Sequence, residues 1–192
     1  MRESIKVQSL SILLMAIVYL LIIPGCKQEE TAQGQDNLVD FEQRLKELGI
    51  QLHTPDPPVA NFVHAVHSGN LVFLAGHGPR KPDGSNVTGK VGRDIDLEEA
   101  KEAARLTAIN LLSSLKAEIG DLNKVKRIVK VLGMVNSDES FTDQPQVING
   151  CSDLLVSVFG ERGKHARAAV GMVSLPFNIT VEIEMIVEIE NK

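Results

Sequence analysis

The last part of the chain, residues 178–190, alternates apolar and polar residues almost without interruption. The apolar side chains occupy every second position: Ile179, Val181, Ile183, Met185, Val187 and Ile189. The positions between them are polar, mostly glutamates, and Ile186 is the only exception. A period of two over this length predicts a half-buried antiparallel strand. The chain is therefore expected to fold around a sheet with one apolar face.

A second short apolar run, residues 166–173, precedes that strand and ends in the turn Ser174-Leu175-Pro176. We expect the two runs to pair as a closing hairpin, with Arg167 on one strand and Glu182 on the other. Such a pair is either an ion pair or a carboxylate-binding group beside an acid/base group. The residues by themselves favour the ion pair over a functional site.

The remaining elements follow from periodicity and from their start and stop signals. Strands are expected at 62–66, 71–75 and 125–135, and helices at 38–48, from Asp96 to Gly120, and from Thr142 to Gly160. Asp96 and Glu99 have the spacing of a capping box. The order of the main domain is β-β-α-β-α-β-β. This order predicts an α+β fold with a mixed or antiparallel sheet and two helices on one face.

The N-terminus has the pattern of a targeting segment. Residues 10–23 form an apolar stretch broken only by Ser11, which is shorter than the ~20 residues that span a bilayer but suits a signal peptide. The sequence Ile23-Pro24-Gly25-Cys26 is similar to the lipidation site of bacterial lipoproteins, although Pro24 departs from the usual small residue. An ordinary signal peptide or an uncleaved anchor is the alternative. Lipidation at Cys26 would hold the protein at the cell envelope, outside the cytoplasm, and in the periplasm of a Gram-negative cell.

These signals divide the chain into four parts. Residues 1–25 are expected to be the signal peptide, 26–37 the lipid-anchor site and a tether, 38–56 a short helix with a proline-rich extended segment, and 57–192 the main domain.

Composition excludes some classes of function. The chain is 43% hydrophobic and only 4% aromatic, and its net charge is −5. An acidic domain without a basic cluster or an aromatic platform is a poor partner for nucleic acid, so we expect none.

Cys151 falls in an apolar helical pattern and is expected to be a small buried residue. His64 and His67 lie on opposite faces of a strand, so no metal pair and no cofactor are expected. His165 is expected to be solvated.

Several strings, in order, resemble the RidA/YjgF family, also called endoribonuclease L-PSP or chorismate mutase-like proteins. The strings are SGNLVFLAG (68–76), VLGMVNS (131–137), FTDQPQVING (141–150), RAAVG (167–171), Leu175-Pro176 and VEIE (181–184). The resemblance runs from about residue 57 to residue 190. It implies the RidA fold over 57–192 and a homotrimer whose clefts lie between subunits.

The resemblance also implies an activity and a set of site residues. Deaminases of this family hydrolyse reactive enamines and imines to a 2-keto acid and ammonia. By position, Arg167 would bind the substrate carboxylate, which suits the planar fork of a guanidinium. Glu182 and the carbonyl of Ala169 would place the water, while Asn149 and the backbone N–H of Gly76 would contact the ligand. Glu184 shares a face with Glu182, so either could be the inward carboxylate.

Three positions depart from the deaminase pattern. Phe62 replaces a tyrosine of the first hairpin, Ala75 replaces a serine, and Ala169 replaces a cysteine. His77 could restore a polar group near Gly76. The loss of two hydroxyls leaves a rival function open, a non-enzymatic module that binds or senses a small carboxylate on the same fold.

Overall fold

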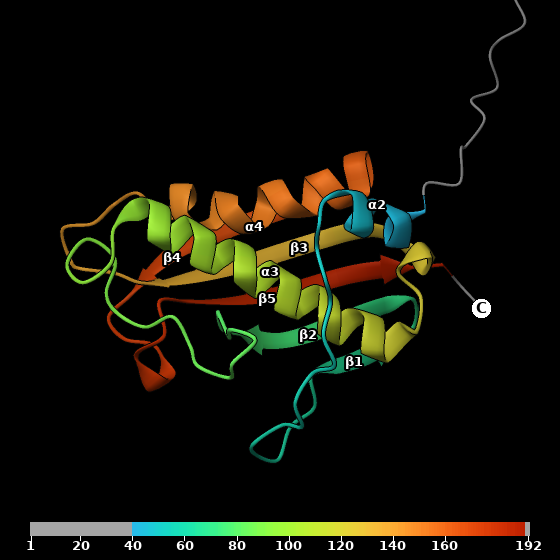
Figure 1. Ribbon diagram of the computed structural model, residues 1–192, viewed down its shortest axis with the longest axis horizontal. Coiled ribbons are helices and arrows are strands. Elements are labelled where there is room, and N and C mark those ends of the chain that lie inside the picture. Colours follow the sequence, from blue (N-terminus) through green and yellow to red (C-terminus); the bar gives the residue numbers. More distant parts are fainter. Residues whose placement is uncertain (1–39, 191–192) are drawn as a thin grey trace, which may run out of the picture. The chain divides into compact units, whose positions relative to one another are not determined.

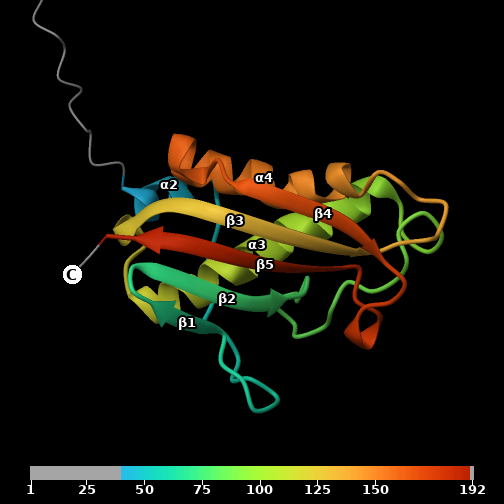
Figure 2. The same ribbon diagram turned by 180° about the vertical axis from the view of Figure 1, so that it is seen from behind.

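The computed structural model describes residues 40–190, and the predicted signal peptide, Cys26 and the predicted tether lie outside them. Five strands form one mixed sheet in the order β1-β2-β5-β3-β4. The strands are β1 (Ala65–Ser68), β2 (Leu71–His77), β3 (Val125–Asn136), β4 (Ala166–Met172) and β5 (Val181–Ile189). Figures 1 and 2 show helices α3 (Leu97–Ile119) and α4 (Gln144–Phe159) on one face of this sheet. The predicted α+β fold with helices on one face is confirmed.

Local sequence explains most of these elements. Asp96 caps α3 as expected, because its side chain accepts from the backbone N–H of Glu99 while the Glu99 side chain accepts from the backbone N–H of Asp96. Gly69, with φ of +62°, forms the two-residue turn between β1 and β2 with Asn70. The first strand begins three residues later than predicted and ends two residues later, so Phe62 and His64 precede it. The short helix α2 (Phe41–Glu47) lies within the predicted 38–48.

The core lies between the sheet and the two long helices. The apolar positions of β5 are buried there as the alternation predicts: Val181, Ile183, Met185 and Val187. Helices α3 and α4 approach closely at Gly150, where an added Cβ would lie 1.9 Å from the carbonyl oxygen of Lys101. Among residues 40–190, no helix has the length and apolarity required to cross a membrane.

The closing hairpin predicted from the sequence is wrong. β4 pairs in parallel with β3, and β5 pairs with β3 on its other side, antiparallel. The reason is that α4 is a crossover connection, which returns the chain to the edge of the sheet parallel to the strand before it. Alternation within a strand gives its buried face but not its neighbour. β4 is consequently an edge strand, and β3 separates it from β5.

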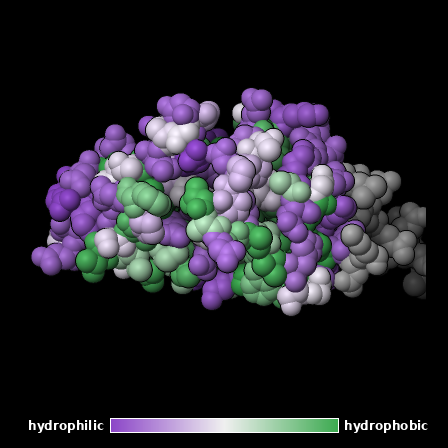
Figure 3. All heavy atoms as spheres, turned by 90° about the horizontal axis from the view of Figure 1, so that it is seen from below, coloured by the Kyte–Doolittle hydropathy of each residue, from purple (hydrophilic) through white to green (hydrophobic). Residues whose placement is uncertain are grey.

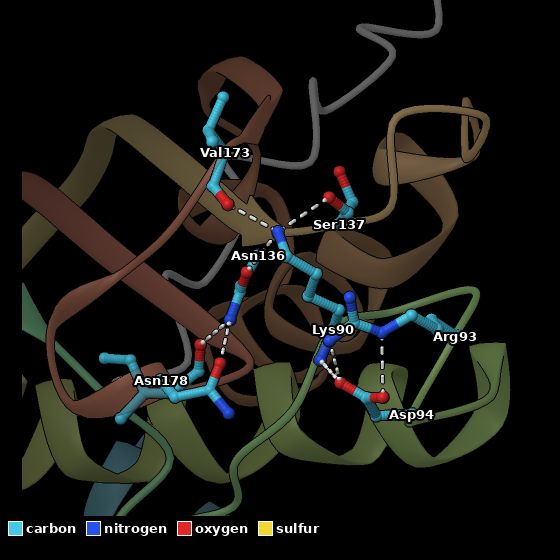
Figure 4. A network of polar contacts seen from close by, with 8 residues as sticks. Lys90, Arg93, Asp94, Asn136, Ser137, Val173 and Asn178 are labelled. Carbon is cyan, nitrogen blue, oxygen red and sulfur yellow. Dashed lines mark hydrogen bonds and ion pairs between the residues drawn. The ribbon is translucent and has the colours of Figure 1, made fainter.

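A polar network fixes the connection that carries the chain from β4 to β5 (Figure 4). The ammonium of Lys90 donates to the Asn136 side chain at 3.2 Å, to the carbonyl of Ser137 at 3.3 Å, and to the carbonyl of Val173. The buried Asn136 side chain donates in turn to Oδ1 of Asn178 at 3.0 Å. The short 3-10 turn η3 (Pro176–Asn178) in this connection includes two residues with positive φ, Phe177 and Asn178. The network thus holds a backbone conformation that side-chain sterics disfavour.

The other face of the sheet carries no helix and exposes apolar side chains. Val66 and Phe73 are 55% and 41% exposed, and Val170 and Met172 of β4 are also exposed. The space-filling view shows hydrophobic patches between polar ones at the surface (Figure 3).

Candidate functional site

The Arg167 side chain lies against α4 on the helix-bearing side of the sheet. Its Nη1 donates to Oδ1 of Asn149 at 2.8 Å and to the hydroxyl of Ser152 at 3.0 Å. The two acceptors are three residues apart in α4, so they lie on the same helix face and hold one edge of the guanidinium. Arg167 itself is exposed on the edge strand. Its other N–H groups make no hydrogen bond within residues 40–190, which leaves a fixed cationic fork available to an anion.

Arg167 and Glu182 are not partners within one chain. Arg167 pairs with Val131, whose side chain is buried beneath the helices, whereas Glu182 alternates with the buried Val181 and Ile183. The two charged groups therefore project from opposite faces of the sheet. In the described part of the chain Arg167 forms no ion pair with any carboxylate. The ion-pair interpretation of these two residues therefore does not hold within one chain.

His165 contacts Ser152, the hydroxyl that accepts from Arg167, so its prediction as a solvated residue is wrong. Its Nε2 lies 3.1 Å from the Ser152 hydroxyl, and its Nδ1 lies 2.7 Å from the carbonyl oxygen of Gly163. Burial, followed by the positive charge of Arg167, lowers the pKa of His165 below its ordinary value. Sequence reasoning missed Ser152 and His165 because the contact joins residues thirteen positions apart.

Glu182 lies on the helix-free face, against the backbone of Gly76. A Cβ at position 76 would be 2.2 Å from Oε1 of Glu182, so a larger residue there would displace this flexible carboxylate from its present position. Burial, followed by the negative charge of Glu184, raises the pKa of Glu182 above its ordinary value. Glu184 is on the same face but exposed. Of the two glutamates, Glu182 has the environment of an acid/base group.

His77 follows Gly76 in the chain, but its ring faces α3, on the side of the sheet opposite to Glu182, and neither ring nitrogen is free. Its Nδ1 is 2.7 Å from the carbonyl of Ala75 and its Nε2 is 2.7 Å from the hydroxyl of Ser114. Burial lowers the pKa of His77, which favours the neutral ring. His77 and Phe62 line a pocket of about 240 Å³ together with Gly76 and His64. Phe62 is 47% exposed, and its ring centroid lies 6.1 Å from that of His64.

The other sequence candidates have simpler environments. Ala169 lies two residues beyond Arg167 on β4, so it shares the helix-side face, and it is half-buried. Ala75 is half-buried next to Gly76. Cys151 is buried as predicted, and burial raises the pKa of its thiol to about 12, so it is not a nucleophile at neutral pH. The described residues hold no cluster of three or more His, Cys, Asp or Glu side chains suited to a metal.

The structure thus contains two half-sites. One is a preorganised arginine on an edge strand, backed by α4, and the other is a carboxylate with a raised pKa beside a glycine. A preorganised guanidinium is suited to binding an anion, and a carboxyl group with a raised pKa is suited to acid/base chemistry. The family model "YjgF/chorismate mutase-like, putative endoribonuclease" matches residues 42–189. The chain belongs to this family, and the predicted family membership is confirmed.

Relatives of this chain are known in both sequence and structure. Protein TCP17 of Trypanosoma cruzi is 44% identical over 148 residues, which are 77% of this chain and 92% of that protein. The crystal structure of Atu1372 from Agrobacterium tumefaciens, a protein of unknown function, is 49% identical with a TM-score of 0.73, and the match covers 80% of this chain and 96% of that one. RidA from an Antarctic Psychrobacter is 26% identical with a TM-score of 0.51, covering 72% of this chain and 97% of that one.

Proposed function

We propose that this protein is a RidA-like hydrolase that converts an enamine or imine bearing a carboxylate into a 2-keto acid and ammonia. The observation that carries the proposal is the Arg167 guanidinium, which α4 holds at one edge and which has no carboxylate partner within residues 40–190. The likeness to RidA of Psychrobacter supports a small-molecule hydrolase. Glu182, with its raised pKa, supplies the second group that such a reaction needs.

A second copy of the chain completes the proposed site. Within one chain the two half-sites project from opposite faces of the sheet, so a single chain cannot apply both to one small ligand. Association of the β4 edge of one copy with the helix-free face of another, which exposes Val66 and Phe73, would bring Arg167 of the first copy toward Glu182 of the second. Burial of this apolar surface favours association. We therefore propose the homotrimer with intersubunit clefts that the family resemblance implies.

The reaction follows from the two groups. Arg167 binds the substrate carboxylate and fixes the imine carbon relative to the cleft. An enamine first takes up a proton from solvent at its terminal carbon and becomes the imine. Glu182 then accepts a proton from water while the water oxygen bonds to the imine carbon, and the nitrogen takes up a proton from solvent as the C=N bond becomes single. The resulting carbinolamine loses ammonia when its hydroxyl proton is removed and its nitrogen is protonated, which leaves the keto acid. The Ala169 carbonyl and the Gly76 N–H would orient the water and the substrate.

The rival proposal is a non-enzymatic module that binds or senses a small carboxylate. It is favoured by Phe62, which is exposed at the pocket and has no hydroxyl, and by the alanines at positions 75 and 169. On this proposal Arg167 has the same role, but Glu182 serves only packing or ligand contact.

An assay with freshly generated 2-aminoacrylate separates the two proposals. We expect the full-length chain, purified in mild detergent, to accelerate release of the keto acid over buffer. We expect Arg167→Ala to lower kcat/KM by about 100-fold or more, since a bidentate charge-assisted contact is lost. The matched control is Arg127→Ala, an exposed arginine on β3, which should retain full activity. Binding of small keto acids without any acceleration would favour the module and contradict the hydrolase.

We further propose that Cys26 carries lipid and anchors the protein outside the cytoplasm, periplasmic in a Gram-negative cell. The proposal rests on the apolar segment 10–23 and the Gly25-Cys26 junction. We expect Cys26→Ser to move the protein from the membrane fraction to the soluble fraction, while Cys151→Ser leaves the distribution unchanged. A Cys26→Ser protein that stays with the membrane would contradict lipidation.

A further inference from the structure

The hydrogen bonds around Arg167 have only one consistent direction. A guanidinium can only donate, so the Ser152 oxygen accepts from Nη1 of Arg167. The carbonyl of Gly163 can only accept, so Nδ1 of His165 carries the proton of the neutral ring. The free lone pair of His165 is then on Nε2, and the Ser152 hydroxyl donates to it. The direction runs from Arg167 through Ser152 and His165 to Gly163.

We propose that Ser152 and His165 are positioning residues for Arg167, and that binding of a carboxylate to Arg167 is accompanied by proton uptake at His165. This inference rests on the proposed carboxylate-binding role of Arg167. It does not require that the bound molecule be hydrolysed.

The positioning role follows from the geometry. An arginine side chain has many rotamers, so an unrestrained one would lose conformational entropy on binding a ligand. Asn149 and Ser152 hold Nη1 before any ligand arrives. The Ser152 oxygen keeps its lone pair directed at Arg167 only while its own hydrogen points to Nε2 of His165. His165 thereby sets the orientation of the arginine from one residue further away.

The proton coupling follows from the same contacts. When His165 is protonated, both ring nitrogens donate, so the Ser152 oxygen faces two donors and its own hydrogen loses its acceptor. Two positive charges then lie one hydroxyl apart, which disfavours the protonated ring while Arg167 is unpaired. A carboxylate on Arg167 offsets that repulsion. Since coupling is reciprocal, binding that raises the pKa of His165 must itself become tighter as the pH falls.

Arg167 is the charged group that controls the protonation of His165. The other charged residues on the neighbouring elements are Asp153 on α4, Glu161 and Arg162 in the 3-10 turn η2 (Gly160–Gly163), Lys164, and the exposed Lys130 of β3, which pairs with Ala166. Lys164 is paired with Glu161 at 2.6 Å. Arg162 donates to the carbonyl of Val125 and lies over the ring of Phe41. Asp153 lines a groove with Lys101 and Arg105, away from His165.

The test measures binding of 2-oxobutanoate, a stable 2-keto acid, to the full-length chain in mild detergent between pH 4.5 and 8. The background is Glu182→Gln, so that titration of Glu182 contributes nothing. We expect binding at pH 5 to be about three- to tenfold tighter than at pH 8, because one pKa unit corresponds to tenfold. The pKa of His165, followed by NMR of labelled histidine, should rise when the keto acid is added. The neutral analogue 2-oxobutanamide should leave it unchanged.

Two variants separate positioning from mere packing. We expect His165→Gln, whose side-chain oxygen can still accept from Ser152, to bind within about threefold of the parent at pH 8 but to lose the pH dependence. Ser152→Ala, a small change within α4, should weaken binding about tenfold at every pH. An unchanged pH dependence in His165→Gln, unchanged affinity in Ser152→Ala, or no keto-acid binding at any pH would overturn the inference. Coupled binding without imine hydrolysis would uphold it and contradict only the proposed hydrolase.

Discussion

Replacing Glu182 by Gln is expected to abolish most of the turnover while making the folded protein more stable at neutral pH. Removal of a general base costs about 10²- to 10⁴-fold in rate. The gain in stability has the opposite sign because burial and Glu184 disfavour the ionised form of Glu182, and Gln has the same shape without the charge.

The pH dependence of that stability follows from the raised pKa of Glu182. An acid with a raised pKa in the folded state contributes stability below its unfolded value, here 4.5, and loses it as the pH rises through the folded value. The melting temperatures of Glu182→Gln and the unchanged protein should therefore diverge between pH 4 and pH 7, with the variant higher at pH 7. Thermal unfolding at the two pH values measures this directly.

Glu184→Gln is the matched control. It lies on the same face but is exposed, and it contributes to the raised pKa of Glu182. We expect it to keep most of the activity and to lower the pKa of Glu182. Loss of turnover in Glu184→Gln together with normal turnover in Glu182→Gln would show that Glu184, and not Glu182, is the acid/base group.

The second large effect is expected in the core, at Gly150. Gly150→Ala should lower the free energy of unfolding by about 3 kcal/mol, which corresponds to roughly 6–12 °C in melting temperature. The added Cβ would lie 1.9 Å from the carbonyl oxygen of Lys101, and a backbone atom cannot move aside as a flexible side chain can. Helices α3 and α4 would have to separate, which would open voids between their other contacts.

Gly160→Ala controls for the intrinsic cost of replacing glycine. Gly160 has a φ of +57° and a ψ of −131°, but no atom lies within 4 Å of an added Cβ, so only backbone strain of about 1–3 kcal/mol is expected. Chemical denaturation of both variants measures the difference. Equal losses in the two proteins would show that the helix contact at Gly150 can relax.

The elements of the fold could be predicted from sequence, but their pairing could not. The alternation of residues 178–190 gave the buried face of β5, and Asp96 and Glu99 gave the start of α3, because each signal is local. The position of β3 between β4 and β5 depends on where α4 returns the chain, and that is set by packing over the whole sheet. For this reason the predicted hairpin joined β4 to β5, although both strands pair with β3.

Some residues of the candidate site could be predicted from the sequence, and others could be found only in the structure. Arg167, Asn149 and Glu182 were predicted from the family strings, and the structure brings Arg167 and Asn149 into contact. Ser152 and His165 were missed because neither belongs to those strings, and the glycine and lysine before His165 resemble a solvated loop. His77 was predicted as a source of polar contacts, yet both its nitrogens bond to the protein itself. Only side-chain geometry reveals which hydrogen-bonding groups are already occupied.

The contact between Gly76 and Glu182 also limits how this protein can change over evolution or in the laboratory. With an added Cβ only 2.2 Å from Oε1, any side chain at position 76 competes for the space that the acid occupies. A larger residue at position 76 would therefore make the Glu182 side chain rotate, which would move the acid relative to the rest of the site. Substitutions at Phe62, which is exposed and lines the same pocket as Gly76, would change the shape of that pocket while position 76 stays a glycine.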